Sequence, residues 1–180
     1  VLNGVDISIK QGTKIGLSGG NGTGKSTLLN IATGFLTPEE GAIILNGDNI
    51  THFEAWKFAR LGIKRTFQKV RFNEALILKE QLYTSDEMIK RNLDMLKDAG
   101  LIDYLYAFPN EVPLPILRKV EVIRALLERP GYLFLDEPSA GMAATDLHEF
   151  GEFLNEHLDA DISLVVVEHR LELMKKLDAN

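Results

Sequence analysis

The sequence contains no cysteine, and it lacks both a long apolar run and a long basic run. Without cysteine the chain has no disulfide framework and no thiolate metal site. No apolar run approaches the roughly 20 residues that a membrane-spanning helix needs. The net charge of −6 argues against nucleic acid as a partner. What is present is a chain of 180 residues, 45% of them hydrophobic, which suits one compact domain with a buried core.

A glycine-rich segment at residues 19–27 reads Gly-Gly-Asn-Gly-Thr-Gly-Lys-Ser-Thr. It matches the phosphate-binding loop pattern G-x-x-x-x-G-K-[ST] (P-loop). An expected strand at residues 15–17 precedes it, and an expected helix at residues 27–32 follows it. This order gathers backbone N–H groups and a positive helix terminus around one point, which favours a bound phosphate. The sequence therefore predicts a nucleotide site formed by Gly19, Asn21, Gly22, Thr23, Gly24, Lys25, Ser26 and Thr27.

Short apolar runs alternate with helical patterns along the rest of the chain. Strands are expected at residues 5–9, 42–45, 62–67, 132–135 and 162–167, and helices at 53–61, 86–99, 118–128, 144–158 and 170–177. Apolar strands that alternate with helices are typical of a parallel sheet covered on both faces. Residues 69–117 contain no convincing strand. We therefore expect an α/β core at 1–68 and 118–180, interrupted by a helical subdomain at 69–117.

Polar side chains follow three of the expected strands. Asp136 and Glu137 follow one apolar run, Gln68 follows a second and His169 follows a third. Beside a P-loop, an acidic residue at a strand end holds magnesium, and its neighbour can polarise the attacking water. A glutamine at such a place can orient water, and a histidine can hydrogen-bond the γ-phosphate. The predicted catalytic residues are Glu137, His169, Gln68 and Lys25, and the predicted magnesium ligands are Ser26, Gln68 and Asp136.

The order of P-loop, Gln68, Asp136 with Glu137, and His169 resembles that of ATP-binding-cassette (ABC) ATPases, and the resemblance covers nearly the whole chain. Some stretches are similar, more specifically, to the ATPase subunits of branched-chain amino acid importers. These stretches are residues 2–5, 61–68, 134–142 and 166–169.

The resemblance implies a P-loop NTPase fold with a mainly parallel sheet flanked by helices, an antiparallel β part and a small helical subdomain. It also implies ATP and Mg²⁺ as cofactors and ATP hydrolysis coupled to transport. Such subunits pair head to tail around two ATP molecules. They lie on the cytoplasmic face of a membrane, where they drive permease subunits. The permease contact is expected around residues 68–75, with Phe72, Leu76 and Ile77 as candidate lining residues.

One segment departs from the resembled family. The family signature, Leu-Ser-Gly-Gly-Gln or a near variant, precedes a basic helix, and the aligned residues 112–116 here read Val-Pro-Leu-Pro-Ile. Proline has no N–H to donate, and the signature hydroxyl is missing. Our hypothesis is an asymmetric pair, in which a different ATPase subunit supplies an intact signature to the ATP bound by this chain.

Three readings stay open at this point. The first is a transport ATPase, the second a soluble ABC ATPase that acts on ribosomes, DNA or Fe–S assembly, and the third a regulatory nucleotide-binding subunit with little hydrolysis. The acidic charge and the importer-like stretches favour the first, and the altered signature favours the third. The chain begins inside an expected strand and ends soon after the helix that follows His169, so we expect a trimmed or divergent chain.

Overall fold

A four-stranded parallel sheet forms the centre of the computed structural model, which describes residues 2–20, 22–82 and 85–179. The strand order is β1 (Lys14–Leu17), β6 (Ser163–Val167), β5 (Tyr132–Asp136) and β4 (Ile63–Arg65). All neighbouring pairs are parallel. Every residue of β6 is buried, as are four of the five in β5, because helices cover both faces of the sheet. The predicted α/β fold with a parallel sheet is confirmed.

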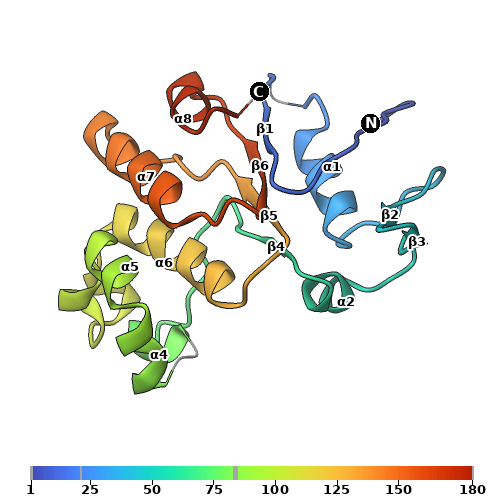
Figure 1. Ribbon diagram of the computed structural model, residues 1–180. Coiled ribbons are helices and arrows are strands. Elements are labelled where there is room, and N and C mark those ends of the chain that lie inside the picture. Colours follow the sequence, from blue (N-terminus) through green and yellow to red (C-terminus); the bar gives the residue numbers. More distant parts are fainter. Residues whose placement is uncertain (1, 21, 83–84, 180) are drawn as a thin grey trace.

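The helices lie on the two sides of this sheet (Figure 1). Helices α1 (Lys25–Ala32) and α2 (Ala55–Arg60) lie on one side, and α6 (Leu114–Leu127), α7 (Ala144–His157) and α8 (Leu171–Lys176) lie on the other. Two hydrophobic clusters correspond to the two sides. Along β5, Phe134 joins the cluster with α1, whereas Leu133 and Leu135 join the cluster with α6 and α7. This alternation follows from the period of two in a strand.

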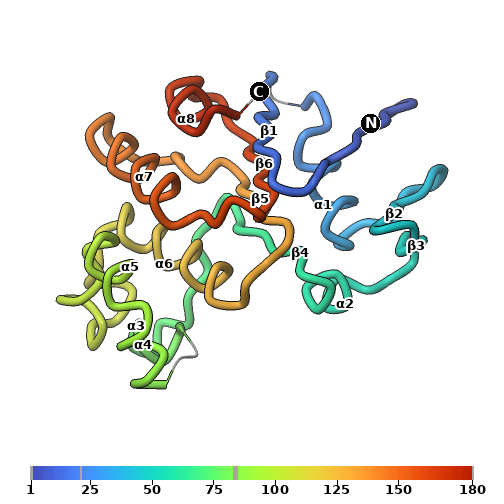
Figure 2. Tube along the Cα trace, viewed as in Figure 1, coloured from blue at the N-terminus to red at the C-terminus, as the bar shows by residue number. Residues whose placement is uncertain are grey.

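Short helices fill the region predicted to be a helical insert. They are α3 (Leu78–Gln81), α4 (Asp86–Arg91) and α5 (Leu93–Asp98), followed by two 3₁₀ turns, η1 (Ile102–Tyr104) and η2 (Pro109–Glu111). Figure 2 shows this part beside α6, and its buried leucines join the same cluster as α6 and α7. The boundaries of a separate subdomain stay a prediction. Among the described residues, no helix has the length and apolar character that a membrane span requires.

The helix predicted at residues 86–99 is divided into α4 and α5 at Asn92. The backbone there has φ of −111° and ψ of 23°, and Asn92 Nδ2 donates to the carbonyl of Met88 at 2.8 Å. An asparagine side chain that bonds to the local backbone competes with the helical pattern, which explains the break. Gly100, with φ of 69°, follows the last helical turn as expected.

Helix α6 begins at Leu114, one turn earlier than the predicted start near Arg118. Pro113 is the N-cap residue and Pro115 lies in the first turn. Proline is compatible with a first turn because the N–H groups there have no partner within the helix. The prediction of the start was therefore wrong.

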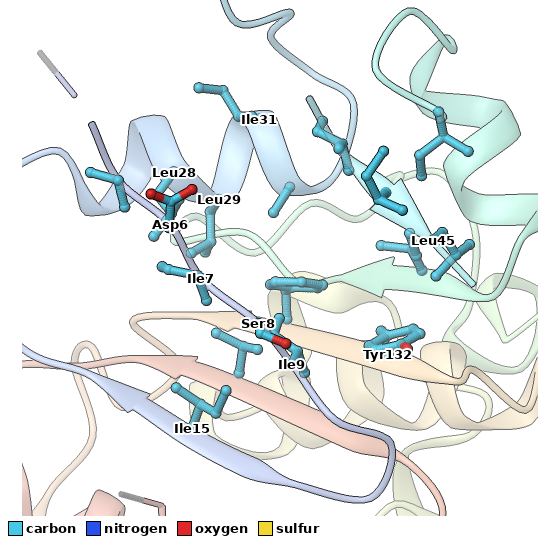
Figure 3. A pocket seen from close by; sticks show the side chains of 18 of the residues that line it. Asp6, Ile7, Ser8, Ile9, Ile15, Leu28, Leu29, Ile31, Leu45 and Tyr132 are labelled. Carbon is cyan, nitrogen blue, oxygen red and sulfur yellow. The ribbon is translucent and has the colours of Figure 1, made fainter. Parts of the chain in front are cut away.

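Residues 5–9 do not form the predicted strand, although Val5 and Ile7 follow the alternating pattern. Within the described residues no strand pairs with this segment, and alternation without a hydrogen-bonded neighbour does not make a ladder. The segment lines one hollow together with β2 (Ile44–Leu45), which pairs with β3 (Asp48–Asn49) in a second, antiparallel sheet. With α1 and the sheet, it borders an apolar hollow of about 500 Å³ (Figure 3).

Candidate functional site

The predicted phosphate-binding loop connects β1 to α1. Gly22 and Gly24 have φ of 79° and 95°, in the left-handed region that glycine adopts without strain. Gly24 is the N-cap of α1 and has no side-chain cap hydrogen bond, so the first N–H groups of the helix are directed at the loop. Ser26 and Thr27 belong to that first turn. Asn21, also predicted here, lies outside the described residues.

Lys25 closes the loop on itself. Its Nζ donates to the carbonyls of Gly19 at 2.7 Å and Gly20 at 2.8 Å. The hydroxyl of Thr23 donates to the same Gly20 carbonyl at 3.0 Å. The loop is therefore curled around an ammonium group next to a helix N-terminus. Positive charge and free N–H groups at one place are what a phosphate group requires.

The register of the sheet aligns the ends of three strands. Leu17 of β1 pairs with Val167 of β6, which pairs with Asp136 of β5. The segments that follow these residues therefore leave the sheet at its carboxyl edge. They carry the P-loop, His169 and Glu137. Gln68 comes from the segment after β4, which pairs with the other side of β5.

Three predicted catalytic residues meet at the carboxylate of Glu137. Gln68 Nε2 donates to Glu137 Oε2 at 2.7 Å, and His169 Nε2 lies 3.2 Å from Glu137 Oε1. Glu137 has φ of 46°, which is uncommon for a residue other than glycine and is found at functional sites. This conformation is fixed by the bond from the Glu137 N–H to the Val167 carbonyl at 2.9 Å. The structure thus joins residues from three segments that are distant in sequence.

Asp136 forms a buried ion pair with Arg65. Arg65 Nη2 donates to Asp136 Oδ2 at 2.8 Å, and the two side chains are 5% and 9% exposed respectively. Burial raises the pKa of Asp136, while the Arg65 guanidinium acts in the opposite direction. Arg65 Nη1 also donates to Asn30 Oδ1 at 2.8 Å and to Thr33 Oγ1 at 3.2 Å. Arg65, which sequence reasoning missed, therefore links Asp136 to α1, the helix that carries Ser26.

Glu168 is a second residue that sequence reasoning missed. It is 2% exposed, and its Oε1 accepts the backbone N–H of Ser139 at 2.8 Å. Its Oε2 accepts those of His169 at 3.0 Å and Arg170 at 3.2 Å. The carboxylate therefore fixes both the turn that carries His169 and the segment after Glu137. An acidic residue directly after the apolar run at residues 164–167 was the available indication.

The residues predicted to hold magnesium differ in their surroundings. Gln68 is directed at Glu137, Asp136 is paired with Arg65 through Oδ2, and Ser26 lies in the first turn of α1. Hydroxyl, carboxylate and amide oxygens are ligands that Mg²⁺ prefers. The chemistry of this donor set therefore fits the ion, and the hydrogen bond from Arg65 engages Oδ2 of Asp136.

The start of α6, where the family signature aligns, offers few donors. Pro115 has no N–H, and the N–H groups of Ile116 and Leu117 both donate to the Pro113 carbonyl at 3.1 Å. Of the residues 114–117, only Leu114 retains an N–H for a ligand. This helix start is therefore a poor anion site.

Comparisons with known proteins agree with this geometry. Residues 2–140 match the family described as ABC transporter. The probable branched-chain amino acid transport ATP-binding protein LivG of Methanocaldococcus jannaschii is 29% identical over 194 residues, which cover 96% of this chain and 76% of that relative. The ABC transporter ATP-binding protein YtrE of Bacillus subtilis is 28% identical over 181 residues, which cover 94% and 78% respectively.

A solved structure gives the same result. The crystal structure of an ATP-binding cassette of an ABC transporter in its ADP conformation matches with a TM-score of 0.82 and 30% identity, over 96% of this chain and 76% of that chain. The resemblance noted in the sequence is thus confirmed by both kinds of comparison. The chain belongs to the ABC transporter family, as an ATP-binding subunit.

Proposed function

We propose that this chain hydrolyses ATP to ADP and phosphate and thereby powers an importer whose permease subunits lie in a membrane. The observation that carries the proposal is the carboxylate of Glu137, held between Gln68 and His169 at the sheet edge where the P-loop begins. A general base next to a triphosphate cradle is the arrangement that phosphoryl transfer to water requires.

The P-loop supplies the binding half of the site. Backbone N–H groups at the start of α1 and the ammonium of Lys25 would bind the phosphates and stabilise charge that develops during transfer. Magnesium, when bound, would neutralise charge on the outer phosphates. Ser26, Asp136 and Gln68 are the residues proposed to hold it, with Asp136 acting directly or through water.

Glu137 supplies the chemical half. Its carboxylate would orient a water molecule and accept its proton during in-line attack on the γ-phosphorus. Gln68 and His169 each contact one carboxylate oxygen, which restricts the direction in which Glu137 faces. Gln68 would also orient the attacking water, and His169 would hydrogen-bond the γ-phosphate.

The transport role rests on relatives, among them a LivG protein named for branched-chain amino acid transport. By analogy, the chain would act on the cytoplasmic face of a membrane and contact permease subunits near residues 68–75. It would pair head to tail with a second ATPase subunit. Because the start of α6 retains only one free N–H among residues 114–117, we propose that this second subunit is a different chain with an intact signature.

A second candidate is a nucleotide-binding subunit with little hydrolysis. The same poor anion site at α6 favours it, because a partner's ATP would be incompletely enclosed. The two candidates differ in the ratio of ATP binding to ATP turnover, since only the first predicts a chemical step that depends on Glu137.

Glu137→Gln tests the proposed function, with Glu172→Gln on the exposed surface of α8 as the matched control. We expect single-turnover hydrolysis of Mg-ATP to fall by about 10²-fold or more in Glu137→Gln, with ATP affinity retained. The control should behave as the wild-type chain. Equal hydrolysis in Glu137→Gln and wild type would remove Glu137 from this role.

A further inference from the structure

Arg118 is a buried charged residue of α6 that holds part of the main chain near Glu137. It is 5% exposed. Its Nη1 donates to the carbonyl of Phe67 at 2.9 Å, and its Nη2 donates to the carbonyl of Gln68. One planar guanidinium therefore donates to two successive peptide carbonyls. Arginine can do this because its N–H donors are held in fixed directions, and lysine cannot reproduce the geometry.

Burial of this guanidinium argues against a role in packing alone. Arg118 forms an ion pair with Glu121, with Nη1 to Oε2 at 3.3 Å and side chains 5% and 8% exposed. Its Nε has no partner in the described part of the chain. An apolar side chain would fill the space without the cost of desolvating a charge. The hydrogen bonds to the Phe67 and Gln68 carbonyls and the ion pair with Glu121 offset that cost only while the segment at residues 67–68 is held in this position.

A short series of contacts connects Arg118 to the proposed site. Arg118 bonds to the main chain of Gln68, and the side chain of Gln68 bonds to Glu137 Oε2 at 2.7 Å. Arg118 is not among the residues that contact Glu137. It therefore acts on the direction of the Gln68 side chain, through the two peptide groups that it holds.

We propose that Arg118 is a positioning residue, which orients Gln68 and through it the carboxylate of Glu137. The proposal rests on the proposed ATP hydrolysis. It places α6 among the parts of the chain that determine the rate of hydrolysis. It also gives a physical route from the start of α6 to the reacting groups.

The test compares Arg118→Met and Arg118→Lys with Lys119→Met. Lys119 is the matched control because it is 7% exposed on the same helix, but its Nζ is directed at the Asp98 carbonyl. We expect the rate of hydrolysis at saturating ATP to fall about 10- to 100-fold in Arg118→Met, with KM changed less than about twofold. Arg118→Lys should be intermediate. Lys119→Met should keep the wild-type rate.

A double-mutant cycle separates positioning from a general loss of structure. In a Gln68→Ala background, Arg118→Met should have no further effect on the rate, because Gln68 is the group through which Arg118 acts. An undiminished effect in that background would overturn the proposal. Amide hydrogen exchange provides a second readout: residues 66–70 should exchange faster in Arg118→Met than in Lys119→Met, and equal exchange would also contradict it.

The two proposals fail in different ways. No hydrolysis by the wild-type chain, alone or with a second cassette, would overturn the proposed function. Normal hydrolysis by Arg118→Met would overturn only the role of Arg118, because the wild-type chain would then still hydrolyse ATP.

Discussion

Helices α1 and α6 begin in opposite ways, although both starts are expected to lie near a phosphate group in this family. Helix α1 follows Gly24, whose left-handed backbone leaves the first N–H groups exposed to the P-loop. Helix α6 follows Pro113 and has Pro115 in its first turn. The contrast shows that a helix N-terminus favours an anion only where its first N–H groups are free, whatever its dipole.

The charged side chains at the two helix starts also differ in direction. Lys25 donates to carbonyls of the P-loop, the part of the chain expected to face a ligand. Arg118 is buried and donates to carbonyls of the segment that carries Gln68. We therefore expect the start of α1 to bind a ligand, whereas Arg118 of α6 bonds within the chain, to the segment that carries Gln68.

The largest effect expected from this comparison is that of Lys25→Ala. If the Lys25 ammonium bonds to phosphate oxygens as proposed, its removal should weaken Mg-ATP binding about 10- to 100-fold, as for other charge-assisted hydrogen bonds. Titration calorimetry measures the affinity. Lys175→Ala, at an exposed position of α8, is the control and should bind as wild type. Unchanged affinity in Lys25→Ala would contradict the assignment of the P-loop.

How far the sequence predicts the site depends on how local each feature is. The P-loop is set by consecutive residues, so its pattern and flanking elements could be recognised directly. Gln68 and His169 could be placed near Glu137 because parallel strands end at one edge. Arg118, however, contacts a residue 51 positions away, and no pattern in the sequence indicates that bond.

The same reasoning applies to the fold. Strand β6 is predictable because burial on both faces favours a continuous apolar run, here residues 164–167. Residues 5–9 have a strand pattern but no paired neighbour, so a local pattern gave the wrong answer. The start of α6 was predicted one turn too late. Proline disrupts the interior of a helix, but the first turn accommodates it, so Pro113 and Pro115 do not delay the start.

The next largest expected effect is the change in the free energy of unfolding with pH that comes from Glu121, the carboxylate paired with Arg118 near the start of α6. Burial raises its pKa to about 6, and Arg118 acts in the opposite direction. The folded chain therefore binds more protons here than the unfolded chain between pH 4.5 and about 6. Protonated Glu121 favours folding, so its contribution to the free energy of unfolding should fall by about 2 kcal/mol as the pH rises through this range.

Denaturant unfolding of the wild type and of Glu121→Gln, repeated across this pH range, measures that contribution. Glu121→Gln should lack it, so the difference in free energy of unfolding between the two proteins should change with pH. Asp136, whose pKa is also raised, titrates in both proteins and cancels in the difference. A difference independent of pH would show that Glu121 ionises in the folded chain as it does in the unfolded one.

The smallest expected effect comes from making the start of α6 resemble that of α1. Pro113→Ser with Pro115→Gly returns a hydroxyl and two backbone N–H groups to the segment aligned with the family signature. If a second copy of the chain then binds this start through its ATP, hydrolysis by the isolated protein should rise about threefold to tenfold, the effect of one or two hydrogen bonds. The rate should also rise more steeply with protein concentration, because the complete site needs two copies.

Pro113→Ala with Pro115→Ala is the control that separates the hydroxyl from the N–H groups. It returns both backbone N–H groups without the hydroxyl or the close approach that glycine permits. We expect a smaller gain from it. Glycine in a first turn also weakens a helix, by about 1 kcal/mol relative to alanine, so thermal unfolding must accompany the rates. If the Ser and Gly variant is folded and binds ATP yet hydrolyses it no faster, the prolines are not what limits the isolated chain. The proposed need for a different partner subunit would then lose its physical basis.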